Sequence, residues 1–161
     1  MLDTPPDLRF DTLLAAAATL SANQPVVMLN LLRYRAQAAY DDPAAQPPRT
    51  GQQAYQAYID AFMQYNDPAA FTIVFHGAAQ AQLAGLPGEQ WDAVALVEYR
   101  NLGVFRRWVE SDVYTRHVAP IRRAALADWR LLLLTRPGAP ATPAATDTGY
   151  RRGLMAQETI Y

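Results

Sequence analysis

The stretch Val26-Val27-Met28-Leu29-Asn30-Leu31-Leu32-Arg33-Tyr34 decides the fold. Side chains of a β-strand point alternately to the two faces of its sheet. Residues 26, 28, 30, 32 and 34 would share one face and residues 27, 29, 31 and 33 the other, and both sets are mostly apolar. We therefore expect a strand that is covered by protein on both faces.

Three more strands and two helical regions are expected on the C-terminal side of this strand. Apolar residues at helical spacing predict a helix that starts at Gly51 and ends near residues 66–68. Strands are expected at residues 71–80, 91–99 and 129–136. A second helical region spans residues 104–128, and Pro120 should kink it or restart it.

The resulting order is strand, helix, strand, strand, helix, strand. This is the split βαβ or ferredoxin-like arrangement, a four-stranded antiparallel sheet with two helices on one face. We expect an α+β domain over residues 25–136. A long loop, rich in proline and small residues, is expected at residues 35–50.

The other face of this sheet would carry large apolar side chains as well. In the strand at 71–80 we expect Phe71, Ile73 and Phe75 on one face and Thr72, Val74 and His76 on the other. An uncovered apolar face needs a partner, so we expect a homodimer with stacked sheets, a dimeric α+β barrel. The alternative is that the N-terminal helix or the C-terminal tail covers that face within one chain.

The two ends of the chain differ from the domain between them. In residues 1–24, Thr4 reads as an N-cap, followed by Pro5 and then Asp7 in the first turn of a helix. Acidic residues stand where a secretion signal needs positive charge, so a cytoplasmic location is expected. Residues 137–149 read as a linker. We expect the C-terminal tail, which follows this linker and ends at residue 161, to contact the partner subunit.

The composition narrows the class of function. The chain has 161 residues, 51% of them hydrophobic, and a net charge of -1, which gives no electrostatic footprint for nucleic acid. It lacks an apolar run long enough for a membrane span. Cysteine is absent and all basic residues are arginines, so thiol, Cys–metal and Schiff-base lysine chemistry are excluded. No metal site is expected, and the Arg-only, Ala-rich composition fits a bacterial source.

Candidate site residues are expected around a pocket between the sheet and its helices. The amide of Asn30 interrupts an apolar run and must find partners, either a ligand or backbone and water. His76 and His117 are candidate general bases, or ordinary histidines at a surface or interface. Arg33 could hold a carboxylate together with Arg35 and Arg100, or these arginines could pair with acidic side chains at 41, 42 or 98.

A set of aromatic residues could line the same pocket or simply fill the core. The set comprises Tyr55, Tyr58, Trp91, Tyr99, Trp108 and Tyr114.

Several ordered segments resemble the domain of unknown function 1330 family. They are residues 28–35, Gly51 with Tyr55 and Tyr58, residues 91–99, the set Phe105, Trp108, Ser111 and Tyr114, and residues 123–128. The similarity covers roughly residues 25–136. It implies membership of the dimeric α+β barrel superfamily, in agreement with the expected fold. The biochemical role of that family is unassigned, so the resemblance implies no reaction.

A second resemblance is to the haem-degrading monooxygenases of the same superfamily. Those proteins use an Asn on the first strand, a Trp before the second helix and a His on that helix. Asn30 and Trp108 match, but the family's His aligns with Val118, and His117 lies one residue earlier. One residue turns a side chain by about 100° around a helix.

These patterns lead to one expected function and two alternatives. We expect a protein that binds or converts a small organic molecule without a metal or nucleotide cofactor. The first alternative is a non-catalytic dimeric interaction protein, which predicts that no cavity is present. The second is a haem-binding or haem-degrading protein.

Overall fold

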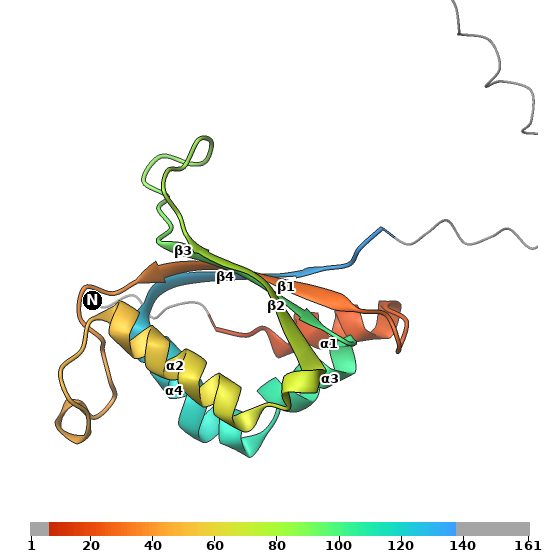
Figure 1. Ribbon diagram of the computed structural model, residues 1–161, viewed down its shortest axis with the longest axis horizontal. Helices are drawn as coiled ribbons and strands as arrows, with labels where there is room; N and C mark the ends of the chain where they lie inside the picture. Colours follow the sequence, from red (N-terminus) through yellow and green to blue (C-terminus); the bar gives the residue numbers. More distant parts are fainter. Residues whose placement is uncertain (1–6, 138–161) are drawn as a thin grey trace, which may run out of the picture.

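The computed structural model describes residues 7–137 and contains one four-stranded antiparallel sheet (Figure 1). The strands lie in the order β2-β3-β1-β4, which with the helices between them is the ferredoxin-like arrangement. The expected fold class is therefore confirmed. The strands are β1 (Val26–Tyr34), β2 (Phe71–Ala78), β3 (Ala93–Tyr99) and β4 (Leu126–Leu134).

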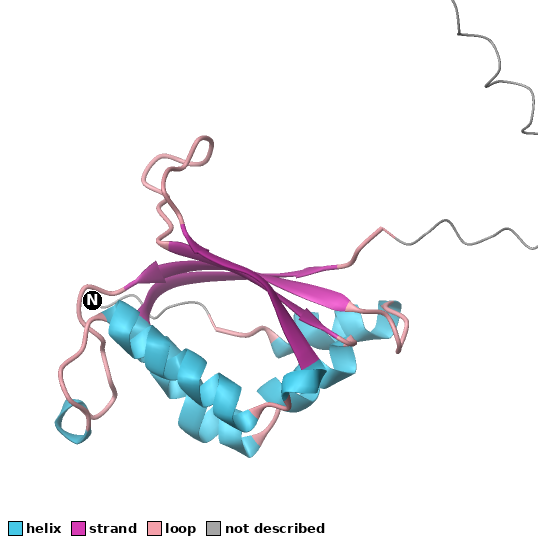
Figure 2. Ribbon diagram, viewed as in Figure 1, coloured by secondary structure: helices cyan, strands magenta, loops and turns pink. Residues whose placement is uncertain are grey.

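All helices of the described chain lie on one face of the sheet (Figure 2). The longest, α2, begins at a capping box in which Thr50 and Gln53 satisfy each other's backbone N–H groups. Pro120 lies in the first turn of α4 and restarts the helix, as expected. The helices are α1 (Phe10–Thr19), α2 (Gly51–Tyr65), α3 (Leu102–Val109) and α4 (Ala119–Ala125), and the short turns are η1 (Pro43–Ala45), η2 (Pro68–Ala70) and η3 (Tyr114–Val118).

The fourth strand begins earlier than the expected residue 129. Leu126 already pairs with Tyr34 of β1, and its side chain is fully buried. Helix α4 therefore ends at Ala125, because burial of Leu126 in the sheet outweighs the helical pattern that continues to Asp128. The expected limits of β1 are confirmed, and β2 and β3 are each two residues shorter than expected.

A β-bulge in β2 changes which of its side chains face the helices. Ile73 pairs with Val97, but Phe75 pairs with the next residue of β3, Leu96, so Val74 is the extra residue. The expectation that Phe71, Ile73 and Phe75 share a face is therefore wrong for Phe75. The alternation continues out of phase after the bulge. His76 pairs with Ala95 on the helix-covered face, and Phe75 lies on the open face.

The N-terminal helix starts later than the expected Thr4. Helix α1 begins at Phe10 with Arg9 as its N-cap, so Asp7 precedes the helix instead of lying in its first turn. Asp7 forms an ion pair with the buried Arg122, and Leu8 packs against the core. These tertiary contacts outweigh the weak helix propensity of a short N-terminal segment. Thr4 lies outside the described residues.

Helix α1 does not cover the open face of the sheet. Its apolar residues pack against the core between sheet and helices, together with Leu131 and Leu133 of β4, on the same side as the other helices. The N-terminal half of the single-chain alternative is therefore wrong. The tail at 138–161, with its expected contact to the partner subunit, lies outside the described residues.

The open face is apolar and exposed, as expected from β1. Phe75 of β2 is 53% exposed and Leu132 of β4 is 44% exposed. The register places on this face Val27, Leu29, Leu31, Phe75, Val94, Leu96, Leu132 and Leu134. The loop between β2 and β3 projects from the sheet on the side away from the helices (Figure 1). No helix within residues 7–137 is both long and apolar enough to cross a membrane.

Candidate functional site

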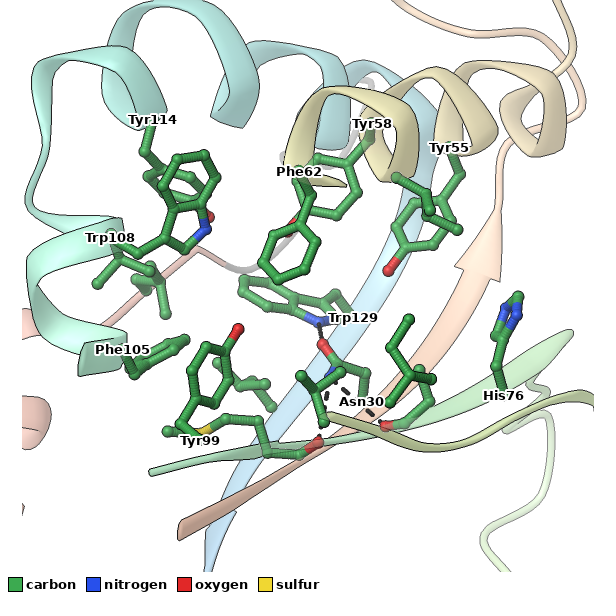
Figure 3. Close-up of a pocket in the computed structure, with 18 residues that line it drawn as sticks. Asn30, Tyr55, Tyr58, Phe62, His76, Tyr99, Phe105, Trp108, Tyr114 and Trp129 are labelled. Atoms are coloured by element: carbon green, nitrogen blue, oxygen red, sulfur yellow. Dashed lines mark hydrogen bonds between the residues drawn. The ribbon is translucent and has the colours of Figure 1, made fainter. Parts of the chain in front are cut away.

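A cavity of about 100 Å³ lies between the sheet and the helices (Figure 3). Its wall is mainly aromatic, and edge-on ring contacts such as Phe62–Trp108, 5.7 Å between centroids, hold the rings in place. The aromatic residues of the wall are Tyr55, Tyr58 and Phe62 from α2, Phe105 and Trp108 from α3, Tyr114 from η3, Tyr99 from β3 and Trp129 from β4.

Asn30 lies on the floor of this cavity and is held by three neighbours. Its Oδ1 accepts a hydrogen bond of 3.0 Å from Nε1 of Trp129. Its Nδ2 donates two longer bonds, to the carbonyl oxygens of Met28 at 3.3 Å and Ala95 at 3.5 Å. The expected need of a buried amide for partners is thus met within the chain. The weak bonds of Nδ2 leave that group the more available one for a ligand.

Three tyrosine hydroxyls supply further polar atoms to the cavity. Burial raises the pKa of Tyr55, Tyr58 and Tyr99 above the usual value, so all three phenols are neutral at neutral pH. None of the hydrogen bonds within residues 7–137 involves these hydroxyls. The hydroxyls of Tyr55 and Tyr99 point into the space between sheet and helices (Figure 3). They can donate to, or accept from, a bound molecule.

His76 lies at the exposed edge of the same cavity. The bulge in β2 turns its side chain to the helix-covered side, and the imidazole rises toward α2 (Figure 3). The side chain is exposed to solvent. Of the two expected histidines, His76 is the one in contact with the cavity.

The other expected site residues lie elsewhere. His117 is exposed on η3 and is not part of the cavity wall. Trp91 lines a separate groove of about 610 Å³ on the open face, beside Leu31 and Val94. The guanidinium of Arg130 stacks over Trp91, with Cζ 5.3 Å from the ring centroid. The structure therefore brings together Asn30, Tyr55, His76, Tyr99, Trp108 and Tyr114, and leaves out Arg33, Trp91 and His117.

The expected arginine cluster is not formed. Arg33 is exposed on the open face near the end of β1, whereas Arg100 follows β3 at the opposite end of the sheet. Arg100 donates to the carbonyl oxygen of Ala69 at 3.0 Å. Glu98, offered as an ion-pair partner, binds Arg136 instead at 2.7 Å. The strand register separates these charges, and sequence proximity did not reveal it.

Among the residues near the cavity that the sequence did not predict, Trp129 and Arg122 contribute polar groups. Trp129 was expected only as the first residue of a strand, although its alternation with Leu131 and Leu133 placed all three on one face. No expectation was attached to Arg122, yet it is 1% exposed and stacks on Trp129. An isolated arginine in an otherwise apolar helical stripe was the available signal.

The described residues do not fit a haem group. Val118, which takes the place of the haem-ligating histidine in the resemblance, is fully buried in the core and cannot coordinate iron. His117 is exposed to solvent, and the cavity has a volume of only about 100 Å³. Within residues 7–137 no cluster of three or more His, Asp or Glu side chains could hold a metal ion.

Comparison with known proteins identifies structural relatives without an assigned activity. No protein-family model and no curated protein matches the chain, so the resemblance to the domain of unknown function 1330 family stays a prediction. The methylated RPA0582 protein superposes with a TM-score of 0.73 at 29% identity, covering 86% of this chain and 99% of that one.

A second structure is of the RPA0582 protein from Rhodopseudomonas palustris, described as a protein of unknown function. It superposes with a TM-score of 0.68 at 30% identity and covers 83% of this chain and 98% of that one. The similarity thus extends over nearly the whole of the relative. The chain belongs to the same family as the RPA0582 protein.

Proposed function

We propose that the protein is a homodimer that binds a small, largely apolar organic molecule in the aromatic cavity of each subunit. The observation that supports this most is the cavity of about 100 Å³, left open among aromatic side chains from both layers. An apolar cavity of about 150 Å³ holds benzene, so a single ring or a short branched chain is the matching size.

The polar groups around the cavity suit orientation of such a ligand. Nδ2 of Asn30 is a donor, and the neutral hydroxyls of Tyr55 and Tyr99 are donors or acceptors. Ligand sites are commonly apolar with a few convergent polar groups of this kind. If the ligand is converted, His76 is the side chain at the cavity whose type exchanges protons near neutral pH.

The open sheet face supports the homodimer. Its apolar side chains come from all four strands and form one continuous surface. Contiguous exposed apolar patches are typical of interfaces, and a two-fold axis would place the same patch on both sides. The strands that carry this face also carry the cavity floor, so each subunit would have its cavity on the outer side of the joined sheets.

The cavity also favours ligand binding over the alternative of a purely structural dimer. That alternative predicts an interior filled by side chains. The aromatic residues instead leave a space that extends to exposed His76. The haem alternative gains no support from the position of His117.

Native mass spectrometry of the freshly purified protein tests the dimer and any retained ligand together. A bare monomer would contradict the stacked-sheet dimer. Benzamide, a neutral single-ring probe, then tests the cavity through the fluorescence of Trp108 and Trp129. Ala95→Leu should fill the cavity and abolish binding, because Ala95 lies in its wall. Ala18→Leu, the same change on the exposed side of α1, should leave binding intact. Equal binding by both variants would refute the assignment.

A further inference from the structure

The buried side chain of Arg122 lies behind the aromatic cavity and lacks a full set of partners. The residue is 1% exposed, and its Cζ stands 4.0 Å from the ring centroid of Trp129, a residue of the cavity wall. Nη2 is hydrogen bonded to Asp7, and the hydroxyl of Tyr114, another residue of the cavity wall, also interacts with the guanidinium, but Nε and Nη1 have no hydrogen bond of regular geometry within residues 7–137. A buried guanidinium requires an anion and hydrogen-bond acceptors to offset its loss of water.

The anion that now meets this requirement comes from the N-terminal segment. Oδ1 of Asp7 contacts Arg122, and its Oδ2 lies 3.5 Å from Nη1 of Arg123. The carboxylate is about half exposed, whereas the guanidinium is enclosed. Asp7 therefore reaches Arg122 from the surface and leaves Nε and Nη1 without a hydrogen bond of regular geometry. The arrangement is that of an anion site filled by a group of the chain itself.

The same segment separates two hollows of the molecule. Leu8 lines the aromatic cavity and also a neighbouring groove of about 350 Å³ that runs along α1. Trp129, Phe105 and Leu131 are likewise shared by the cavity and the groove, and Asp7 lies in the groove wall. Movement of residues 7–8 would join the two hollows and expose the guanidinium to a molecule in the aromatic cavity.

We propose that Arg122 is the anchor for a carboxylate group on the ligand of the aromatic cavity, and that Asp7 holds this position until the ligand arrives. The inference rests on the proposed function and narrows it to small carboxylic acids with a ring or a branched apolar chain. The ligand's carboxylate would replace that of Asp7 on Arg122, while its apolar part occupies the cavity that Leu8 now helps to close. No bond is made or broken.

The experiment compares benzoate with benzamide, which have the same ring and nearly the same shape but differ in charge. Asp7→Asn keeps the size of the side chain and removes the competing carboxylate. We expect this variant to bind benzoate at least tenfold more tightly than the unaltered protein does, with benzamide affinity changed less than twofold. Calorimetry measures both constants. Benzoate should also raise the melting temperature of Asp7→Asn more than that of the unaltered protein.

Asp11→Asn is the matched control. It makes the same change four residues later, at a fully exposed carboxylate whose ion pair is with Arg9. We expect its benzoate affinity to equal that of the unaltered protein. An equal gain in both variants would show a general charge effect and overturn the inference.

Two further outcomes separate this inference from the proposed function. Benzamide binding without a gain for benzoate in Asp7→Asn would overturn the carboxylate anchor and leave the cavity as a ligand site. Failure of both probes to bind would count against both proposals. If Asp7→Asn does not fold, Arg123→Gln weakens the hold on Asp7 without changing the contacts of Arg122, and should raise benzoate affinity two- to fivefold. An unchanged ratio of benzoate to benzamide affinity there would refute the anchor.

Discussion

Replacing Trp129 with Phe tests how the cavity floor is held together. Trp129 is 6% exposed, and its Nε1 donates the 3.0 Å hydrogen bond to Oδ1 of Asn30. Loss of that donor leaves a partly buried acceptor without its partner, which costs about 1–2 kcal/mol. The smaller ring leaves roughly 40 Å³ unfilled, which adds about 1 kcal/mol at about 24 cal/mol per Å³. We expect unfolding free energy to fall by about 2–3 kcal/mol.

A double-mutant cycle isolates the contribution of the hydrogen bond. Asn30→Leu alone leaves Nε1 of Trp129 buried without an acceptor, so it should also destabilise. The double variant lacks both partners, and we expect its loss of stability to be smaller than the sum of the single losses by about 1–2 kcal/mol. Urea unfolding, followed by far-ultraviolet circular dichroism at one fixed protein concentration, measures all four proteins. If the two single losses of stability add up to the loss in the double variant within about 0.3 kcal/mol, the role assigned to this hydrogen bond is refuted.

Three other expectations concern packing, assembly and pH. Gly51→Ala should lower the free energy of unfolding by at least about 2 kcal/mol in thermal unfolding, because the new Cβ would lie 2.4 Å from two backbone oxygens. Gly103→Ala is the control: its Cβ would meet only side-chain atoms, at 3.1 Å and beyond, so stability should change by less than about 1 kcal/mol. Leu29→Glu on the open face should convert a dimer to a monomer in light scattering, while Met63→Glu on the outer side of α2 should not. Burial alone would raise the pKa of Asp7, but Arg122 and the N–H of Leu8 lower this pKa below its ordinary value of 3.8. The ionised Asp7 therefore stabilises the folded protein fully above about pH 4, and this contribution is lost as the pH falls through the lowered pKa. The stability difference between the unaltered protein and Asp7→Asn should therefore be constant above about pH 5 and become smaller as the pH falls below about 4. A difference that is unchanged between pH 5 and pH 2 would contradict this.

Local patterns in the sequence were sufficient to predict the order of the helices and strands. Each of these signals depends only on residues nearby in the sequence: the two apolar faces of β1, the apolar stripe of α2 and the helix restart at Pro120. Such patterns report directly on which side of an element is buried. The ferredoxin-like topology followed from their order.

The details of the cavity depend on contacts between distant residues. The bulge at Val74 is set by pairing with β3, so periodicity alone placed His76 on the wrong face. The ion pair of Asp7 with Arg122 joins residues 115 positions apart, and it displaced the start of α1. Strand register likewise separated Arg33 from Arg100. These features require the assembled sheet, which explains why sequence reasoning found most aromatic wall residues but missed Arg122 and Trp129.

The bulge in β2 lets the strand carry one extra residue without moving the side chains that follow it to the other face. In a regular ladder that kept Val74, this residue would pair with Leu96, Phe75 would enter the aromatic cavity and His76 would lie on the open face. Loss of Val74 would instead remove the bulge and leave Phe75 opposite Leu96 and His76 opposite Ala95, each on its present face. A one-residue difference in strand length at this point is therefore compatible with the same cavity chemistry. Relatives with one residue fewer here would keep a histidine at the cavity without needing a bulge.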